Sequence, residues 1–114
     1  MKETGYVPGK GEIVWLDFDP QAGHEQAGRR PALVVSPANY NRSTGLMLCC
    51  PITSRVKGYP FEVALGGGRE IQGVVLADQV KSLDWQIRKA EKKGVVSQAV
   101  FDEVLDKIKV ILEG

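Results

Sequence analysis

The chain has 114 residues, of which 43% are hydrophobic and 25% are charged, and its formal net charge is +1. This length predicts one domain, residues 1–114, with a core that needs no disulfide or metal to stabilise it. The near-zero net charge excludes a protein that binds polyanions over its whole surface, so any affinity for nucleic acid must come from local clusters of positive charge.

Short apolar runs between turn residues predict a mainly β protein. Residues 1–11 are expected to form a loosely held leader. Ser97 is expected to cap one C-terminal helix, because apolar residues recur at helical spacing after it. This pattern is typical of a small, partly open β-barrel with a C-terminal α-helix. We expect strands at residues 12–18, 32–36, 46–52, 61–65, 73–77 and 80–85, a turn-rich connection at 37–45, a basic run at 88–93 and the helix at 98–112.

Several of these strands are apolar on both faces, namely residues 32–35, 46–50 and 74–77. One helix cannot cover all of that surface, so the sequence predicts a homodimer. The alternative is that the barrel interior and the helix bury these faces without a second copy.

The cysteines and the absence of long apolar runs bear on the compartment. Cys49 and Cys50 are adjacent in an apolar run, where a strand points them to opposite faces, and we expect core thiols of a reducing compartment. No run is long enough to span a membrane, and the first residues have no apolar signal region. The sequence therefore predicts a cytoplasmic protein without membrane contact.

The densest cluster of polar groups lies at residues 23–31, between the first two predicted strands. It contains His24, Glu25, Gln26 and the adjacent Arg29 and Arg30. Polar density on a loop between stiff apolar strands is typical of a functional site, although a solvated surface loop has the same composition. Smaller polar clusters end two later strands, at residues 53–55 and 78–79.

Several chemistries lack the residues that they need. The single histidine excludes a pair of histidines for acid–base catalysis, and no cluster of metal ligands or Walker-type phosphate loop is present. What remains is carboxylate, guanidinium and hydroxyl chemistry, which can cut RNA without a metal because RNA carries its own 2′-hydroxyl nucleophile. Glu25 could act as the base, Arg30 could hold the phosphorane, and Thr53 could add a hydrogen bond. A glutamate with an ordinary pKa of about 4.3 is a weak base, which predicts a modest catalyst.

Four stretches of the sequence, in this order, resemble the MazF family of toxin–antitoxin endoribonucleases. The likeness extends from Tyr6 to the C-terminal helix. The sequence departs from the family at His24, where a small residue such as serine is common, and the imidazole either assists proton transfer or is only tolerated on the loop. The stretches are residues 15–20 (WLDFDP), 25–37 (EQAGRRPALVVSP), 57–63 (KGYPFEV) and 76–82 (LADQVKS).

The resemblance implies an SH3-like barrel that forms a homodimer, and a type II toxin that cuts single-stranded RNA at short sequences. Cleavage is expected to need no metal or cofactor and to leave a 2′,3′-cyclic phosphate and a 5′-hydroxyl. The resemblance makes Arg30 the principal catalytic residue, with Thr53 assisting at the phosphate and Glu25 as the proposed base. It also implies a MazE-like antitoxin whose acidic, disordered tail blocks the RNA site.

A further set of residues is expected to contact the RNA. Phe18 ranks first for stacking on an unpaired base, ahead of Tyr59 and Trp85, while Trp15 and Trp85 are expected in the core. The amide of Gln79 can meet a base edge, and the ammonium of Lys57 can meet a phosphate or remain a solvated charge. The basic run at residues 88–93 could bind RNA phosphates or an acidic antitoxin tail, or it could be a solvated basic surface. The complete set of expected substrate contacts is Phe18, His24, Gln26, Lys57 and Gln79.

Two other functions are consistent with such a fold. One is a non-catalytic, CcdB-like toxin that binds a protein target such as gyrase. The other is an SH3-like binding module, which normally needs exposed aromatic residues for Pro-rich ligands. The set of Glu25, Arg30 and Thr53 favours the nuclease over the first, and the aromatic content of 7% disfavours the second.

Overall fold

The computed structural model describes residues 5–18, 28–67 and 71–114. Its strands form an antiparallel sheet in the order β4–β5–β3–β2–β1–β7, and β6 pairs with β3 beside this path. The strands are β1 (Glu12–Asp17), β2 (Arg29–Val34), β3 (Leu46–Thr53), β4 (Glu62–Ala64), β5 (Val74–Leu76), β6 (Lys81–Asp84) and β7 (Glu91–Val95). The helical elements are α2 (Ala38–Thr44), the 3₁₀ turn η1 (Ala77–Gln79) and α3 (Gln98–Glu113).

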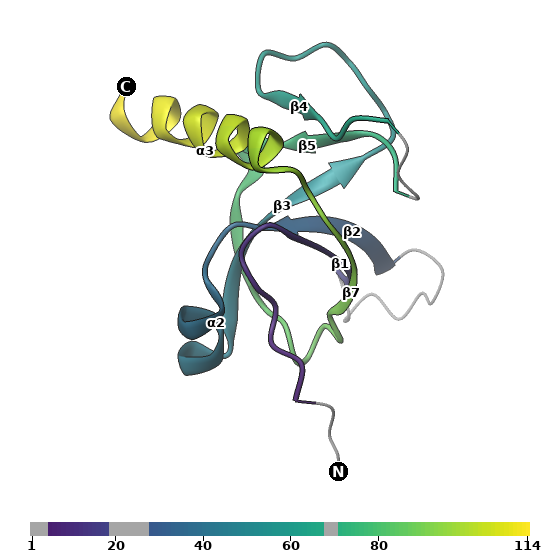
Figure 1. Cartoon of the computed structure of the whole chain (residues 1–114), viewed down its shortest axis with the longest axis vertical. Helices are drawn as coiled ribbons and strands as arrows, with labels where there is room; N and C mark the ends of the chain where they lie inside the picture. Colours follow the sequence, from purple (N-terminus) through teal and green to yellow (C-terminus); the bar gives the residue numbers. More distant parts are fainter. Residues whose placement is uncertain (1–4, 19–27, 68–70) are drawn as a thin grey trace.

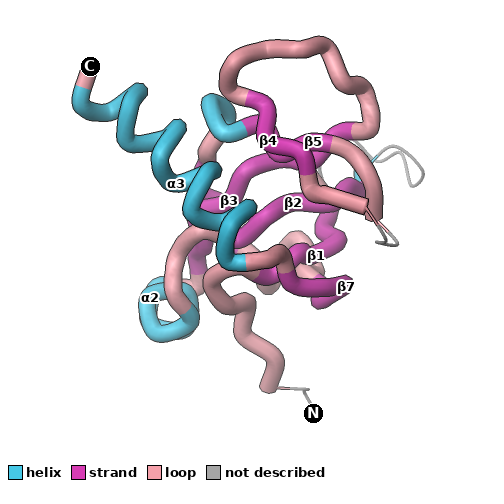
Figure 2. The backbone as a smooth tube through the Cα atoms, turned by 45° about the horizontal axis from the view of Figure 1, so that its top comes forward, coloured by secondary structure: helices cyan, strands magenta, loops and turns pink. Residues whose placement is uncertain are grey.

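The prediction of a mainly β protein with an open sheet and a C-terminal helix is confirmed. β3 is central because it pairs with β2, β5 and β6. Figures 1 and 2 show α3 on one side of the strands, and α2 at the opposite end of the molecule from the β4–β5 pair. The hydroxyl of Ser97 accepts the Val100 N–H at 3.2 Å, so the predicted N-cap of α3 is also confirmed.

Two apolar clusters fill the interior. The first packs Leu33 and Cys50 against residues of α3 such as Val104. The second packs Cys49 against Trp85 and the inward side chains of β1 and β2. The adjacent cysteines therefore point to opposite faces of β3, as predicted, and both thiols are free and fully buried. Burial raises the pKa of each thiol to about 12.

The N-terminal segment closes the second cluster, so the prediction of a loosely held leader is wrong for residues 5–11. Tyr6 and Val7 pack against this cluster, and Pro8 is fully buried. The Gly11 N–H donates to the Val34 carbonyl at 2.8 Å. An apolar face that α3 does not cover is thus covered within the chain, and the burial argument for a homodimer does not apply to that face.

Helix α2 occupies the connection that the sequence predicts to be turn-rich. Its composition has no apolar periodicity, and hydrogen bonds of the fully buried Asn41 hold it in place. The Asn41 amide donates to the carbonyls of Pro8 at 2.7 Å and Ser36 at 3.1 Å, and its oxygen accepts the Ser36 hydroxyl at 2.6 Å. The Trp85 indole N–H donates to the Asn41 carbonyl at 2.9 Å. The helix therefore depends on tertiary contacts that sequence patterns do not reveal.

Strand β7 begins inside the predicted basic run, which the sequence does not identify as a strand. It pairs antiparallel with β1, with a register shift between Ile13 and Val14. Its charged side chains suit an edge strand, where apolar alternation is not required. Lys92 places its ammonium 3.4 Å from the Glu12 carboxylate, which adds an ion pair across the strand pair.

Candidate functional site

The start of β2 and the end of β3 meet at one edge of the sheet. β2 and β3 run antiparallel with Ala32 paired to Pro51, so Arg30, just before this pair in β2, and Thr53, just after it in β3, lie at the same end of the two strands. Both residues line a hollow of about 250 Å³. The structure therefore brings together the two catalytic candidates that lie within the described residues. The full lining of this hollow is Trp15, Arg29, Arg30, Pro31, Ile52, Thr53 and Ser54.

The two adjacent arginines differ in their surroundings. Arg30 is exposed, and within the described ranges no hydrogen bond or ion pair occupies its guanidinium. The guanidinium of Arg29, by contrast, donates to Asp17 at 3.1 Å and to the Lys89 carbonyl at 3.1 Å. An unoccupied guanidinium at the mouth of a hollow can bind an anion through paired N–H donors, so Arg30 has the geometry of an anion ligand and Arg29 does not.

A second hollow, of about 130 Å³, shares Thr53 with the first. Lys57 and Gln79, which the sequence predicts as substrate contacts, lie in its wall. The Thr53 hydroxyl accepts the Arg55 N–H at 3.1 Å, so its own hydrogen can be donated elsewhere. The two hollows form a continuous candidate site around Thr53. The second is lined by Thr53, Arg55, Lys57, Tyr59, Glu62, Leu76 and Gln79.

A carboxylate holds the loop that forms one wall of the second hollow. The two oxygens of Glu62 accept the backbone N–H groups of Lys57 and Gly58, each at 3.0 Å. The Lys57 ammonium lies 5.8 Å from the centre of the Tyr59 ring. The lining of the second hollow has two cations, Arg55 and Lys57, and one anion, Glu62, so this end of the site has a positive balance that suits a phosphate ligand.

The remaining predicted contacts lie elsewhere or cannot be placed. His24, Glu25 and Gln26 fall outside the described residues. Phe18 lines neither hollow: it packs half-buried against the second cluster, with the Lys81 ammonium 5.5 Å from its ring centre.

Tyr59, which the sequence ranks after Phe18 for stacking on a base, lines the second hollow together with Thr53. Its side chain is 54% exposed, and Arg55 lines the same hollow. Two features of the sequence could have identified Tyr59 and Arg55 as site residues: the position of Tyr59 in a loop near Lys57, and the polar cluster that ends β3. Trp85 is buried as predicted, whereas Trp15 is half-buried and contributes to the wall of the first hollow.

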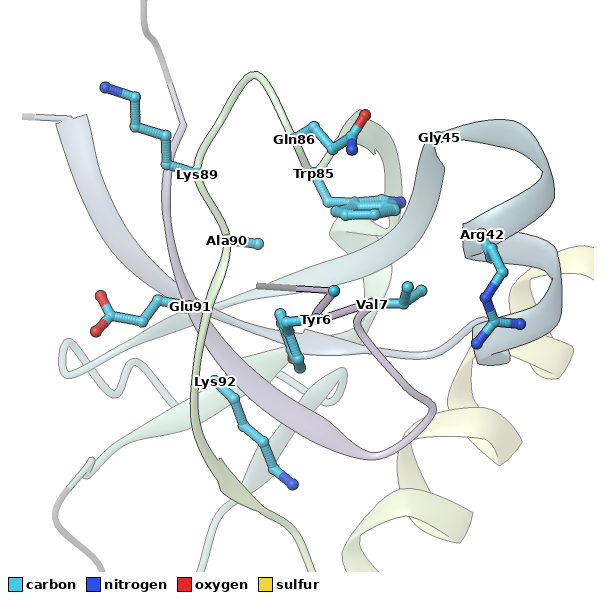
Figure 3. A pocket seen from close by; sticks show the side chains of 11 residues that line it. Tyr6, Val7, Arg42, Gly45, Trp85, Gln86, Lys89, Ala90, Glu91 and Lys92 are labelled. Atoms are coloured by element: carbon cyan, nitrogen blue, oxygen red, sulfur yellow. The ribbon is translucent and has the colours of Figure 1, made fainter. Parts of the chain in front are cut away.

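A hollow of about 760 Å³, larger than the two described above, is at a different place and contains none of the predicted site residues. It lies between the N-terminal segment, the end of α2 and the connection from β6 to β7 (Figure 3). Tyr6, Val7 and Trp85 form part of its wall. Its volume exceeds that of the other two hollows although no predicted site residue lines it, so volume alone does not identify the functional site.

Across residues 5–18, 28–67 and 71–114, no three His, Cys, Asp or Glu side chains are grouped so that they could hold a metal ion. None of the helices that the structure describes is both long and apolar enough to cross a membrane.

Comparison with known proteins places this geometry in a family. A family model described as "PemK-like, MazF-like toxin of type II toxin-antitoxin system" matches residues 9–112. The endoribonuclease toxin MazF of Escherichia coli is 53% identical over 107 residues, which are 94% of this chain and 96% of the relative. The endoribonuclease PemK of Escherichia coli is 40% identical over 90% of this chain and 80% of the relative.

Solved structures agree with these relatives. MazF from Deinococcus radiodurans superimposes with a TM-score of 0.86 at 57% identity, covering 96% of this chain and 99% of that one. A MazE–MazF structure from the same organism gives a TM-score of 0.84 at 51% identity, covering 94% and 96%. The chain therefore belongs to the PemK-like, MazF-like family of type II toxin–antitoxin toxins.

Proposed function

We propose that this chain cuts single-stranded RNA at short sequences without a metal ion or cofactor, leaving a 2′,3′-cyclic phosphate and a 5′-hydroxyl. That the chain is an endoribonuclease toxin follows from its family and from relatives named as endoribonucleases at high identity. The proposal concerns how it cuts. The observation that carries the proposal is the unoccupied guanidinium of Arg30 in a hollow that Thr53 also lines.

The transition state of such a cleavage is a phosphorane with two negative charges. Arg30 can donate two parallel N–H bonds to its non-bridging oxygens, and charge-assisted bonds of this kind are the strong ones. The Thr53 hydroxyl can donate a third. Arg55 and Lys57 add positive potential from the adjoining hollow. All of these groups stabilise the doubly charged phosphorane more than the singly charged phosphate of the bound RNA. Catalysis requires this difference in stabilisation.

The attacking 2′-hydroxyl must lose its proton as its oxygen bonds to phosphorus, and the leaving 5′-oxygen must gain one, which solvent water can supply, as its own bond to phosphorus breaks. We assign removal of the 2′ proton to Glu25 from its place in the family motif, next to Gln26 and the Gly28–Pro31 stretch that leads into β2. A glutamate with an ordinary pKa removes such a proton slowly at neutral pH. His24 is the adjacent group that can exchange a proton near neutrality.

Recognition of the RNA requires bases that are free of pairing. Tyr59 is an exposed aromatic side chain beside Thr53, so a base next to the cut can stack on it. Gln79, at the end of η1, can read a base edge with its amide, and Lys57 can bind a neighbouring phosphate. Phe18, His24 and Gln26 remain predicted contacts for nucleotides farther along the strand.

We further propose a cytoplasmic homodimer. The last turns of α3 expose Val110, Ile111 and Leu112, at 60%, 45% and 76%, and such a group of apolar side chains is a candidate for burial against a second copy. Leu46 and Leu48 on β3 are exposed at 36% and 38% and extend the apolar surface of the chain.

The second proposed partner is a MazE-like antitoxin. Structures of MazE with MazF from Deinococcus radiodurans support an antitoxin for this chain as well. We propose that an acidic, disordered tail of the antitoxin binds Arg30, Arg55 and Lys57, which would exclude RNA from the same cations. The CcdB-like alternative is disfavoured, because the family match is to endoribonucleases.

The test is cleavage of a mixed-sequence single-stranded RNA in excess EDTA, with the ends of the fragments identified. Wild type is compared with Arg30→Ala and with Arg42→Ala, a matched loss of an exposed arginine on α2. We expect wild type and Arg42→Ala to give cyclic phosphate ends, and Arg30→Ala to lose activity by about 100-fold or more. Intact RNA with the wild-type protein, or full activity of Arg30→Ala, would contradict the proposal.

A further inference from the structure

The guanidinium of Arg29, the residue before Arg30, joins separate segments of the chain. Its Nη1 donates to the carboxylate of Asp17, at the end of β1, at 3.1 Å. Its Nη2 donates to the carbonyl of Lys89, in the connection from β6 to β7, at 3.1 Å. Nη2 also lies 3.4 Å from the Trp15 carbonyl and from the carboxylate of Glu91, where β7 begins. The end of β1, the start of β2 and the start of β7 are thus tied by one side chain.

The carbonyl that Arg29 contacts belongs to Lys89, which lies in a tight turn closed by the Lys89 N–H to the Gln86 carbonyl and the Ala90 N–H to the Trp85 carbonyl. Lys89 has a φ of +56°, and it is the one non-glycine residue within the described ranges in the left-handed region. Non-glycine residues keep such a conformation only where the surrounding structure imposes it, and they cluster at functional sites. Figure 3 shows the side chains of Lys89 and Glu91 directed away from Trp85 and Tyr6, so neither fills the large hollow.

Arg88 makes a second connection to the same place. Its Nη1 donates to the carbonyl of Asp17 at 3.0 Å and also to the carbonyl of Phe18. The Asp17 N–H in turn donates to the Arg88 carbonyl at 2.9 Å. The connection from β6 to β7 therefore holds the backbone of Asp17, and the carboxylate of the same residue gives Arg29 a fixed anchor.

We propose that Arg29 is a positioning residue for Arg30, and that the connection from β6 to β7 is the support against which it acts. The two arginines are adjacent in β2, so an anchored Arg29 fixes the peptide from which Arg30 extends into the hollow beside Thr53. This inference rests on the proposed role of Arg30. Catalytic groups must be held within about 0.5 Å of their working geometry, and a misplacement of 1 Å can cost about 100-fold in rate.

The arrangement requires arginine. A planar guanidinium offers donors in two directions at once, toward Asp17 on one side and toward Lys89 on the other, whereas the ammonium of lysine is a single point. Lysine in place of Arg29 keeps the charge but cannot reach both anchors. The charge-conserving variant therefore separates positioning from simple attraction of RNA.

The test measures kcat, KM and the melting temperature of Arg29→Ala and Arg29→Lys on a short single-stranded RNA, with Arg42→Ala as the matched control. We expect kcat to fall about 10- to 100-fold in both Arg29 variants, with KM changed less than about threefold. We also expect Arg29→Ala to lower kcat much less in an Arg30→Lys background than in the wild type. Both changes act on the same catalytic group, so their effects are not additive.

Other outcomes overturn the inference. In one such outcome, Arg29→Ala raises KM, Arg29→Lys keeps KM at the wild-type value, and the salt dependence of RNA binding by Arg29→Ala shows one fewer ion released. Arg29 would then be a direct phosphate contact. If activity falls only in proportion to the amount of folded protein, Arg29 is a purely structural residue. Failure of the proposed function is distinguishable, since it appears as full activity of Arg30→Ala whatever the Arg29 variants do.

Discussion

Gly73 lies directly against the backbone of Thr53. A Cβ added at Gly73 would lie 2.2 Å from the Thr53 carbonyl oxygen and 2.8 Å from its carbonyl carbon. Gly73 also has a φ of +125°, which side chains rarely allow. Because Thr53 is the residue that joins the two hollows, a glycine before β5 sets the position of the candidate site.

Replacing Gly73 by alanine is expected to displace Thr53 and to lower kcat by about 10- to 100-fold. The measurement is the cleavage rate of saturating RNA. Gly66→Ala is the matched control, because Gly66 also has a positive φ of +95° but meets nothing within 4 Å. Equal losses of activity in the two variants would show that backbone strain, and not displacement of Thr53, is responsible.

Replacing Glu62 by glutamine is expected to loosen the loop that carries Lys57 and Tyr59. The amide keeps one oxygen acceptor, whereas the carboxylate uses two to hold the Lys57 and Gly58 N–H groups. KM for RNA should rise about three- to tenfold, since a hydrogen bond to a charged group contributes ~1.5–3 kcal/mol and only part of this is lost. Glu103→Gln, on the exposed side of α3, is the control. An unchanged KM would mean that the loop is held without Glu62.

Replacing Asn41 by alanine is expected to destabilise the protein by about 2–3 kcal/mol. The change leaves the Pro8 carbonyl and the Ser36 hydroxyl buried without their partner. Urea unfolding measures the effect, and Asn39→Ala, on the exposed side of α2, should cost less than about 1 kcal/mol. A loss below that value for Asn41→Ala would show that water replaces the amide.

The two buried thiols are expected to make stability fall in alkaline solution. The folded-state pKa of both Cys49 and Cys50 is raised to about 12 from an ordinary value of 9.0. Between these values the unfolded chain ionises first and binds fewer protons than the folded chain, so the free energy of unfolding decreases as pH rises. The stabilisation is complete below pH 9 and is lost toward pH 12, by ~1.4 kcal/mol per pH unit for each thiol.

Urea unfolding between pH 8.5 and 10 tests this dependence, because the pKa of Tyr6 is raised above its ordinary value of 10.0 and that phenol adds its own effect at higher pH. Desolvation by burial is the main cause of the Tyr6 shift, and the Glu12 carboxylate adds to it. Valine in place of either cysteine should make the slope shallower. If neither Cys49→Val nor Cys50→Val changes the slope of the unfolding free energy against pH, other groups cause the pH dependence.

The sequence predicts the parts of the fold that follow from local patterns. The alternation in β3 correctly placed Cys49 and Cys50 on opposite faces, and the periodicity after Ser97 correctly placed α3. The polar cluster at the end of β3 was visible too, and antiparallel pairing brings it to the start of β2. These features depend on residues close together in the chain.

The features that the sequence misses depend on contacts between distant segments. Helix α2 is short and has no apolar stripe, so its signal lies in the hydrogen bonds of Asn41 to Pro8 and Trp85. Phe18 and Tyr59 are both aromatic residues near polar loops, so the sequence does not show which of them lines a hollow. Only the three-dimensional arrangement shows Phe18 packed against a core and Tyr59 beside Thr53.

The central claim is that the 2′-hydroxyl of the RNA attacks its own phosphate while Arg30 stabilises the phosphorane. The most direct measurement uses a short RNA with one 2′-deoxynucleotide on the 5′ side of the mapped cut, beside the all-ribose strand. The account predicts that the two strands bind with similar affinity and that the deoxy strand stays intact. Cleavage of the deoxy strand at the same bond and at a comparable rate would contradict it.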